Sequence, residues 1–217
     1  VVIEEFLAGP EVSVFAVADG EDVVLLSPAQ DFKRALDGDE GLNTGGMGAY
    51  TPVPRFGFDD AEALRATIFR PVLGELAARG AQYRGLLYAG LVLTDAGPRL
   101  LEFNCRFGDP ETQVVVPRLA SDLGDLLAAA ATGSVAGQEV AWHDDAFVTV
   151  VLASGGYPGA YATGTPISGV DEADARDRVV VFHAGTRRQG EHLVTAGGRV
   201  LAVTGRGADV AAARAVA

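Results

Sequence analysis

Two short turns between apolar runs constrain the possible folds of this chain more than any other sequence feature. The turns are Asp19-Gly20, between Val12–Ala18 and Val23–Leu26, and Asp95-Ala96-Gly97, between Gly85–Thr94 and Arg99–Phe103. Short connections that contain Gly are typical of β-hairpins, and a hairpin makes its two strands antiparallel. Helical segments are interspersed with these hairpins. The pattern therefore predicts an α+β fold rather than a regular parallel βαβ array.

Helix start and stop signals predict two helices in the first part of the chain. Asp59, with Glu62 three residues later, resembles a capping box and should open a helix that Pro71 kinks. Ser121 should cap a second helix, which ends before Gly133.

The remaining segments complete the expected organisation. Residues 27–57 are rich in Gly, Asp, Asn and Pro and predict one long irregular loop, a kind of loop that is usually functional. Further strands are expected at Val1–Phe6, Phe147–Leu152, Val179–His183, His192–Thr195 and Arg199–Thr204. A composition shift near Gly133–Glu139 predicts two domains, residues 1–133 and a smaller, β-rich domain of residues 134–217. Residues 207–217 resemble a helix that lacks a C-terminal cap, so we expect a fragment of a longer protein; frayed native termini are the alternative.

Composition narrows the function classes. Hydrophobic residues make up 48% of the 217 residues, and no apolar run reaches the roughly 18–20 residues that a bilayer span needs, so no membrane partner is expected. The net charge of −12 disfavours binding to a nucleic-acid backbone. Cys105 is the single cysteine, which excludes a disulfide framework and suits a cytoplasmic location. Lys33 is the single Lys among sixteen Arg residues, and this makes it a candidate for a specific role at phosphate.

A candidate metal site lies at the end of the second predicted hairpin. Glu102 and Asn104 are two residues apart on one strand, so their side chains should share a face, opposite Leu101 and Phe103. A carboxylate beside an amide oxygen suits Mg²⁺, which prefers oxygen ligands and often takes only one or two from the protein. The alternative is an ordinary half-exposed strand with polar residues outward.

Two neighbouring motifs favour phosphate chemistry. Cys105–Gln113 combines an Arg, two acidic residues and a Gly-containing turn, and its Arg106 could bind phosphate or carboxylate through two hydrogen bonds. Asn43–Tyr50 is a Gly-rich loop whose backbone N–H groups could approach an anion. Motifs for a P-loop or a serine nucleophile are absent from the sequence.

These motifs together resemble one family. Arg106–Gln113 (Arg-Phe-Gly-Asp-Pro-Glu-Thr-Gln) resembles the signature of phosphoribosylamine–glycine ligase, also called glycinamide ribonucleotide synthetase, an ATP-grasp family of purine synthesis. Gln30–Arg34, Asn43–Tyr50, Gly155–Gly159 and Phe182–Thr186 resemble the same family in its order and spacing. The resemblance covers the whole chain but only the second half of the family's polypeptide. It implies the C-terminal part of an ATP-grasp domain, with a mixed, mostly antiparallel sheet, followed by a small β-rich domain.

The resemblance also implies roles for individual residues. ATP would be held by Glu4, Glu5, Phe6, Leu7, Glu11 and Lys33. Mg²⁺ or Mn²⁺ would be held by Glu102 and Asn104. Glycine and 5-phosphoribosylamine would contact Asp31, Gly45, Gly46, Met47, Gly48, Arg106 and Asp109, with Arg106 and Lys33 as catalytic residues. The strand Gly85–Thr94 lacks the further metal carboxylate that ATP-grasp enzymes commonly carry there.

The implied reaction is ATP-dependent ligation of glycine to 5-phosphoribosylamine through a glycyl phosphate. Positioning and charge neutralisation dominate such phosphoryl transfer, which agrees with a sequence that offers metal ligands, Arg and Lys instead of a nucleophilic triad. The missing N-terminal half of the polypeptide is an expected partner, and the chain alone should be inactive. Two alternatives stay open: another ATP-grasp carboxylate–amine ligase, and a non-catalytic nucleotide-binding or structural fragment.

Overall fold

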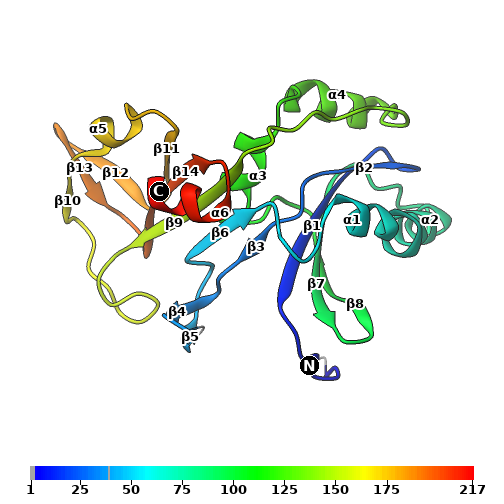
Figure 1. Cartoon of the computed structure of the whole chain (residues 1–217), viewed down its shortest axis with the longest axis horizontal. Coiled ribbons are helices and arrows are strands. Elements are labelled where there is room, and N and C mark those ends of the chain that lie inside the picture. The colour runs from blue at the N-terminus through cyan, green and yellow to red at the C-terminus, as the bar shows by residue number, and fades with distance from the viewer. Residues whose placement is uncertain (1–2, 39) are drawn as a thin grey trace. The chain divides into compact units, whose positions relative to one another are not determined.

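A computed structural model describes residues 3–38 and 40–217 (Figure 1). The chain forms two compact units that interleave along the sequence. Unit 1 comprises residues 1–30, 52–108 and 119–142, and unit 2 comprises residues 31–51, 109–118 and 143–217. The predicted division at residue 133/134 differs from these units, because residues 31–51 and 109–118 pack with the C-terminal residues and form strands and a helix there.

Unit 1 is built on a four-stranded antiparallel sheet with the order β2-β1-β7-β8. The strands are β1 (Glu11–Ala18), β2 (Val23–Leu25), β7 (Gly85–Thr94) and β8 (Gly97–Asn104). Both predicted hairpins are confirmed, as β1–β2 and β7–β8. Phe15 on β1 is fully buried and lies edge-on to Tyr88 on β7, so the long central pair of strands carries the core of this unit.

The helix predicted to start near Asp59 is divided into three parts. These are α1 (Phe58–Leu64), a π-helical turn η1 (Arg65–Phe69) and α2 (Arg70–Ala78). Pro71 has no N–H to donate and its ring crowds the preceding turn, so the interruption directly before it agrees with the predicted kink. The predicted cap is wrong: Gly57 is the N-cap, and its N–H donates to Asp60 at 2.8 Å, not to Glu62.

The second predicted helix is α4 (Leu123–Thr132). Gly133 ends it in the left-handed conformation, at φ 80°, as predicted. The N-cap is Asp122 instead of Ser121, because the Asp122 carboxylate accepts the N–H of Asp125. The Ser121 hydroxyl instead accepts the N–H of Ala141.

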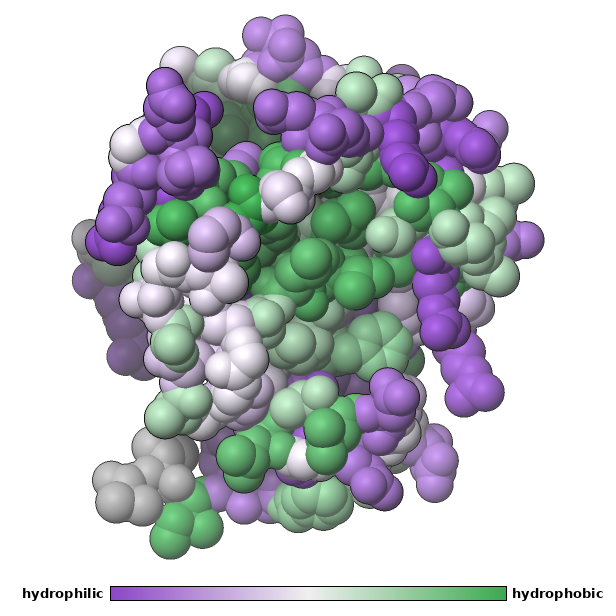
Figure 2. Space-filling model, turned by 90° about the vertical axis from the view of Figure 1, so that its left-hand side faces the viewer, coloured by the Kyte–Doolittle hydropathy of each residue, from purple (hydrophilic) through white to green (hydrophobic). Residues whose placement is uncertain are grey.

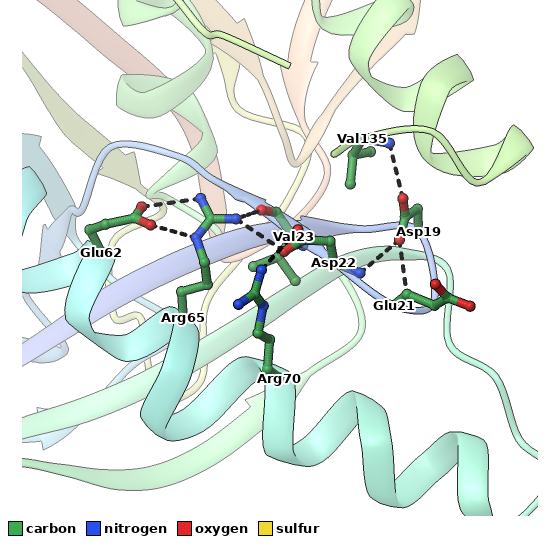
Figure 3. Close-up of polar contacts among 8 residues, drawn as sticks. All are labelled: Asp19, Glu21, Asp22, Val23, Glu62, Arg65, Arg70 and Val135. Atoms are coloured by element: carbon green, nitrogen blue, oxygen red, sulfur yellow. Dashed lines mark hydrogen bonds and ion pairs between the residues drawn. The ribbon is translucent and has the colours of Figure 1, made fainter. Parts of the chain in front are cut away.

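A polar network ties the β1–β2 turn of unit 1 to its helices (Figure 3). Asp19 accepts the N–H groups of Glu21, Asp22 and Val135. Asp22 accepts hydrogen bonds from Arg65, at 3.2 Å, and from Arg70, at 3.0 Å. Burial alone would raise the pKa of both carboxyls, but their hydrogen bonds outweigh it and lower the pKa of Asp19 and of Asp22. The two ionised carboxylates therefore stabilise the folded turn.

The predicted strand at Val1–Phe6 is wrong for the described residues 3–6, and Val1 and Val2 lie outside them. Residues 3–8 have no regular secondary structure, and Ile3 and Phe6 are more than 90% exposed. An apolar run forms a strand only where a neighbouring strand satisfies its backbone groups. Among the described residues no strand pairs with this segment.

Unit 2 contains a five-stranded sheet with the order β11-β14-β9-β6-β3. Its strands are β3 (Gln30–Asp31, at the boundary of the units), β6 (Gly48–Thr51), β9 (Ala146–Ala153), β11 (Val179–His183) and β14 (Arg199–Gly207). A second sheet has the order β10-β13-β12, with β10 (Pro166–Ile167), β12 (Thr186–Gln189) and β13 (His192–Thr195). The predicted strands β9, β11, β13 and β14 are confirmed, and the whole is an α+β fold with antiparallel pairing.

Part of the predicted loop 27–57 is regular structure. It holds β3, β6 and a small hairpin of β4 (Arg34–Leu36) and β5 (Glu40–Asn43). These strands are two to four residues long, and β6 pairs with β9, which lies far along the chain. Such short segments carry no readable alternation, so the prediction failed where distant pairing decides the conformation.

Three helices complete unit 2: α3 (Thr112–Arg118), α5 (Val170–Asp174) and α6 (Val210–Val216). Ala213 on α6 packs against Ala146 and Val148 of β9, with Tyr50 and Val210 beside them. Figure 2 shows apolar residues gathered on the face that it views. The exposed apolar side chains of unit 2 include Val150 and Leu152 of β9. None of the helices in the described part of the chain has the length and hydropathy of a membrane span.

Candidate functional site

Glu102 and Asn104 lie together at the end of β8 in unit 1. The Asn104 side-chain amide donates to Glu102 Oε1 at 3.0 Å, so the two side chains share one face as predicted. The register of β7 and β8 shifts between Gly90, which pairs with Glu102, and Leu91, which pairs with Leu100. This leaves Leu101 as an extra residue, a β-bulge directly before Glu102. The bulge reorients the strand at the predicted metal ligand, a feature that the sequence pattern did not reveal.

The residues at this position fit a hard divalent cation with few protein ligands. Glu102 offers a carboxylate and Asn104 an amide oxygen, and Gly90 opposite Glu102 has no side chain to occupy the space. A Cβ on Gly90 would lie 3.4 Å from Glu102 Cγ and 3.3 Å from the Tyr88 ring. The described residues contain no group of three or more His, Cys, Asp or Glu side chains arranged for a metal. The site therefore suits an ion that takes most of its ligands from phosphates and water.

The segment after β8 begins with two exposed residues, Cys105 and Arg106. Arg106 is exposed and its side chain donates to the carbonyl of Phe107 at 2.9 Å, while the Phe107 ring lies 6.2 Å from that of Phe15. The aromatic contact anchors the turn to the core and leaves the guanidinium available to a ligand. Nearby, burial first and the interaction with Cys105 second raise the pKa of Tyr83 to about 12. Tyr83 therefore stays protonated at neutral pH.

The predicted ATP-contact residues of unit 1 lie in and just after the N-terminal segment. Glu4, Glu5 and Phe6 are exposed and Leu7 is half-buried. Glu5 pairs with Arg99 of β8 at 2.9 Å, an exposed ion pair of small energetic value. Glu11 begins β1 opposite Val92. Their role in holding a nucleotide remains a prediction.

The predicted substrate-contact residues of unit 2 converge on the loop before β6. The Lys33 carbonyl accepts both the N–H and the hydroxyl of Thr44, at 2.7 and 2.8 Å. The Lys33 ammonium lies 3.9 Å from Asp31, whose side chain is only 6% exposed. Lys33 thus contacts both Asp31 and Thr44 of the Gly-rich loop.

Three backbone N–H groups of the Gly-rich loop already have acceptors within the protein. The Gly45 N–H donates to the Tyr157 hydroxyl at 3.1 Å, the Gly46 N–H to Thr44 at 3.0 Å, and the Met47 N–H to the Phe32 carbonyl at 2.7 Å. An anion would have to displace these bonds. The expected contact of this loop with an anion stays a prediction.

Close packing explains the glycines of this loop. A Cβ on Gly45 would lie 3.0 Å from the Arg199 guanidinium carbon, and a Cβ on Gly48 would lie 2.7 Å from the Thr149 carbonyl oxygen. Gly46 has φ +105°, and a Cβ there would lie 2.4 Å from the Pro110 ring. The contacts at Gly46 and Gly48 leave no room for a side chain, whereas one at Gly45 would have to displace the Arg199 guanidinium. The three glycines let the loop pack against β9, Pro110 and an arginine that the sequence analysis did not single out.

Arg199, at the start of β14, is that arginine. It donates to the carbonyls of Gly45, Gly46 and Asp109 and forms an ion pair of 2.8 Å with the Asp109 carboxylate. Only its position directly after Gly197-Gly198 could have drawn attention to it in the sequence. Tyr157, within the Gly155–Gly159 segment, packs on Tyr161 and also accepts the Gly45 N–H.

Two open grooves lie in unit 2, and predicted site residues line only one of them. The larger, of about 780 Å³, is lined by Phe32, Met47 and Gly48 together with residues of β4, β9 and α6. The other, of about 560 Å³, lies among α5, β11, β12 and β13 and includes none of the predicted site residues. The volumes of the two grooves therefore do not by themselves select a functional site in unit 2.

Comparisons with known proteins identify the family of this chain. Residues 1–112 match the family described as phosphoribosylglycinamide synthetase, ATP-grasp (A) domain, and residues 147–217 match the C domain of the same family. The phosphoribosylamine–glycine ligase of Streptomyces coelicolor is 57% identical over an alignment of 217 positions, which covers 99% of this chain and 52% of that protein. The ligase of Rhizobium meliloti is 50% identical, with 99% of this chain and 50% of that protein covered.

Solved structures support the same fold. The crystal structure of phosphoribosylamine–glycine ligase from Thermotoga maritima has a TM-score of 0.84 and 38% identity, and covers 98% of this chain and 52% of that one. The biotin carboxylase of Campylobacter jejuni, with a TM-score of 0.65, 12% identity, and 98% of this chain and 45% of that one covered, shares the fold alone. The chain spans about half the length of the curated relatives that it matches. On the match to both domains, which exceeds half of its residues, the chain belongs to the phosphoribosylglycinamide synthetase family.

Proposed function

We propose that the full-length protein carrying this chain ligates glycine to 5-phosphoribosylamine and forms glycinamide ribonucleotide, ADP and phosphate. The observation that carries the proposal is the ordered match of both family domains, supported by relatives named for this ligase at up to 57% identity. The reaction belongs to purine biosynthesis, and we propose a cytoplasmic location for it.

The proposed chemistry has two steps. A carboxylate oxygen of glycine attacks the γ-phosphorus of ATP, and the bond to the β-phosphate oxygen breaks, which gives glycyl phosphate and ADP. The amine of phosphoribosylamine then attacks the glycyl carbonyl carbon, loses a proton, and expels phosphate with one of the original carboxylate oxygens. Both steps depend on orientation and on neutralising charge more than on a protein nucleophile.

Residues of each unit would contribute separate parts of this machinery. In unit 1, Glu102 and Asn104 would hold Mg²⁺ or Mn²⁺, which when bound neutralises phosphate charge. Arg106 would bind the transferring phosphoryl group, and the segment Glu4–Leu7 with Glu11 would bind adenosine. In unit 2, Lys33 would contact phosphate oxygens, and the two other substrates would contact Asp31, Gly45–Gly48 and Asp109.

Activity is best tested in a full-length chimera, in which residues 1–217 replace the matching segment of the Streptomyces coelicolor relative. We expect ADP formation that requires both glycine and phosphoribosylamine, with glycinamide ribonucleotide identified by mass spectrometry. ADP formation with another acid or amine, and none with this pair, would favour a different ATP-grasp ligase. Absence of turnover from a folded chimera would favour a non-catalytic role.

A further inference from the structure

We propose that Arg199 is a positioning residue that fixes the Asp109 carboxylate and the Gly-rich loop for recognition of an amine-bearing substrate. The inference rests on the proposed function and assigns a role to a residue outside the predicted site. Arg199 Nη1 donates to the carbonyls of Gly45, at 2.6 Å, Gly46, at 3.2 Å, and Asp109, at 2.9 Å. Arg199 Nη2 donates to Asp109 Oδ2 at 2.8 Å. One side chain thereby joins three segments that are far apart in the sequence.

The environment of Arg199 suits a fixed role. Its side chain is 21% exposed, whereas that of Asp109 is 51% exposed. The guanidinium is planar and carries five N–H donors, so it can hold several acceptors in one geometry, whereas the ammonium of Lys cannot reproduce that arrangement. Gly45 accommodates it closely, because a Cβ there would lie 3.0 Å from the guanidinium carbon.

A second side chain secures the same loop. The Tyr157 hydroxyl accepts the Gly45 N–H, so the Gly45 peptide is held by Tyr157 at its nitrogen and by Arg199 at its carbonyl. Gly198 permits this arrangement, because a Cβ there would lie 2.3 Å from the Tyr157 ring. Gly198 therefore leaves room for the Tyr157 ring, and the adjacent Arg199 binds the Gly45 carbonyl.

The consequence for a substrate concerns Asp109. Arg199 binds its Oδ2 atom, and the Gln113 amide donates to its Oδ1 atom at 2.9 Å. A carboxylate held at both oxygens has one orientation, and its half-exposed side keeps lone pairs for a further donor. Both non-nucleotide substrates of the proposed reaction carry a primary amine, which is a donor of suitable kind. A misplacement of about 1 Å in a group that positions a substrate can lower the reaction rate by on the order of a hundredfold.

The first test is kinetic and uses the full-length chimera with Arg199→Met, Arg199→Lys and the exposed control Arg188→Met. We expect the KM of glycine or of phosphoribosylamine to rise at least about tenfold in both Arg199 variants, with the KM of ATP changed less than about twofold. The substrate whose KM rises is the one that Asp109 recognises. Unchanged constants for both substrates in an active chimera, or a rise for ATP alone, would overturn the proposal and leave the proposed function intact.

The second test needs no turnover. Hydrogen exchange of the 217-residue chain should be at least about fivefold faster at Gly45–Met47 in Arg199→Met, and faster at Gly45 in the milder Tyr157→Phe, with β9 unchanged. Arg188→Met should match the wild type. Wild-type exchange rates in both loop variants would overturn the proposal. A chimera without turnover would contradict the proposed function, and the exchange result would then decide the positioning role.

Discussion

Replacing Asp22 by Asn should destabilise unit 1 measurably without disturbing unit 2. The change removes the negative charge of Asp22, with which both Arg65 and Arg70 pair (Figure 3). The amide oxygen of Asn can still accept the Val23 N–H. Asp22 and Arg65 are 24% and 26% exposed, so their charge-assisted bond contributes about 1–2 kcal/mol. Arg70 is 53% exposed and contributes at most about 1 kcal/mol. We expect a loss of roughly 1–3 kcal/mol at pH 7.

The assay follows unit 1 through its own fluorophore. Trp142 is the single tryptophan of the chain, belongs to unit 1, and lies 6.0 Å from Phe58 at the start of α1. Urea unfolding monitored by Trp142 fluorescence gives the free energy of unfolding for the wild type and Asp22→Asn. The control is Asp95→Asn, an exposed carboxylate in the β7–β8 turn, which should change stability by less than about 0.5 kcal/mol.

The pH dependence gives a second criterion. Because the pKa of Asp22 is lowered by folding, its ionised form contributes stability above the unfolded pKa of about 3.9, and this contribution is lost as the pH falls through the folded pKa. The difference between wild type and Asp22→Asn should be complete at pH 5 and above, and should shrink below about pH 4. A difference indistinguishable from that of Asp95→Asn at pH 7, or one that persists undiminished at low pH, would refute the reasoning.

Four further predictions concern the site and the chain as a whole. In the full-length chimera, Glu102→Gln should lower turnover by on the order of a hundredfold at saturating Mg²⁺, with Asp95→Asn as control; unchanged turnover would remove Glu102 from the metal site. Lys33→Arg can keep the pairing with Asp31 yet should lower kcat/KM at least about tenfold, and wild-type kinetics would make Lys33 a surface residue. Gly46→Ala should destabilise unit 2 by roughly 1–3 kcal/mol in urea unfolding followed by circular dichroism, because a φ of +105° and the Pro110 ring both disfavour a Cβ; wild-type stability would contradict this. The 217-residue chain alone should bind ATP–Mg²⁺ no tighter than about 1 mM and should show no glycine-dependent ATP turnover; measurable turnover would mean that it holds a complete site.

The fold could be predicted wherever local signals decide the structure. The hairpins β1–β2 and β7–β8 follow from their turn residues, and Gly133 ends α4 because only a left-handed residue fits there. The prediction failed where a strand depends on pairing with a segment far away in the sequence. The strands β3 to β6 were expected to be loop, and the apolar segment before β1 was expected to be a strand although no described strand pairs with it.

The candidate site shows the same division. Glu102 and Asn104 could be placed on one face from their spacing, but the bulge at Leu101 depends on the register with β7. The glycines of the loop suggested an anion contact, but their close packing against Arg199 and Pro110 could not be predicted. Those contacts join residues far apart in the sequence, which a single sequence does not reveal.

The central claim, that the full-length protein forms glycinamide ribonucleotide through a glycyl phosphate, is tested most directly by following oxygen. The full-length chimera is supplied with ATP–Mg²⁺, phosphoribosylamine and glycine labelled with ¹⁸O in its carboxylate. One labelled oxygen should pass to each phosphate released and one should remain in the amide of the product. Unlabelled phosphate formed together with glycinamide ribonucleotide would contradict the acyl-phosphate route, and absence of that product would contradict the function itself.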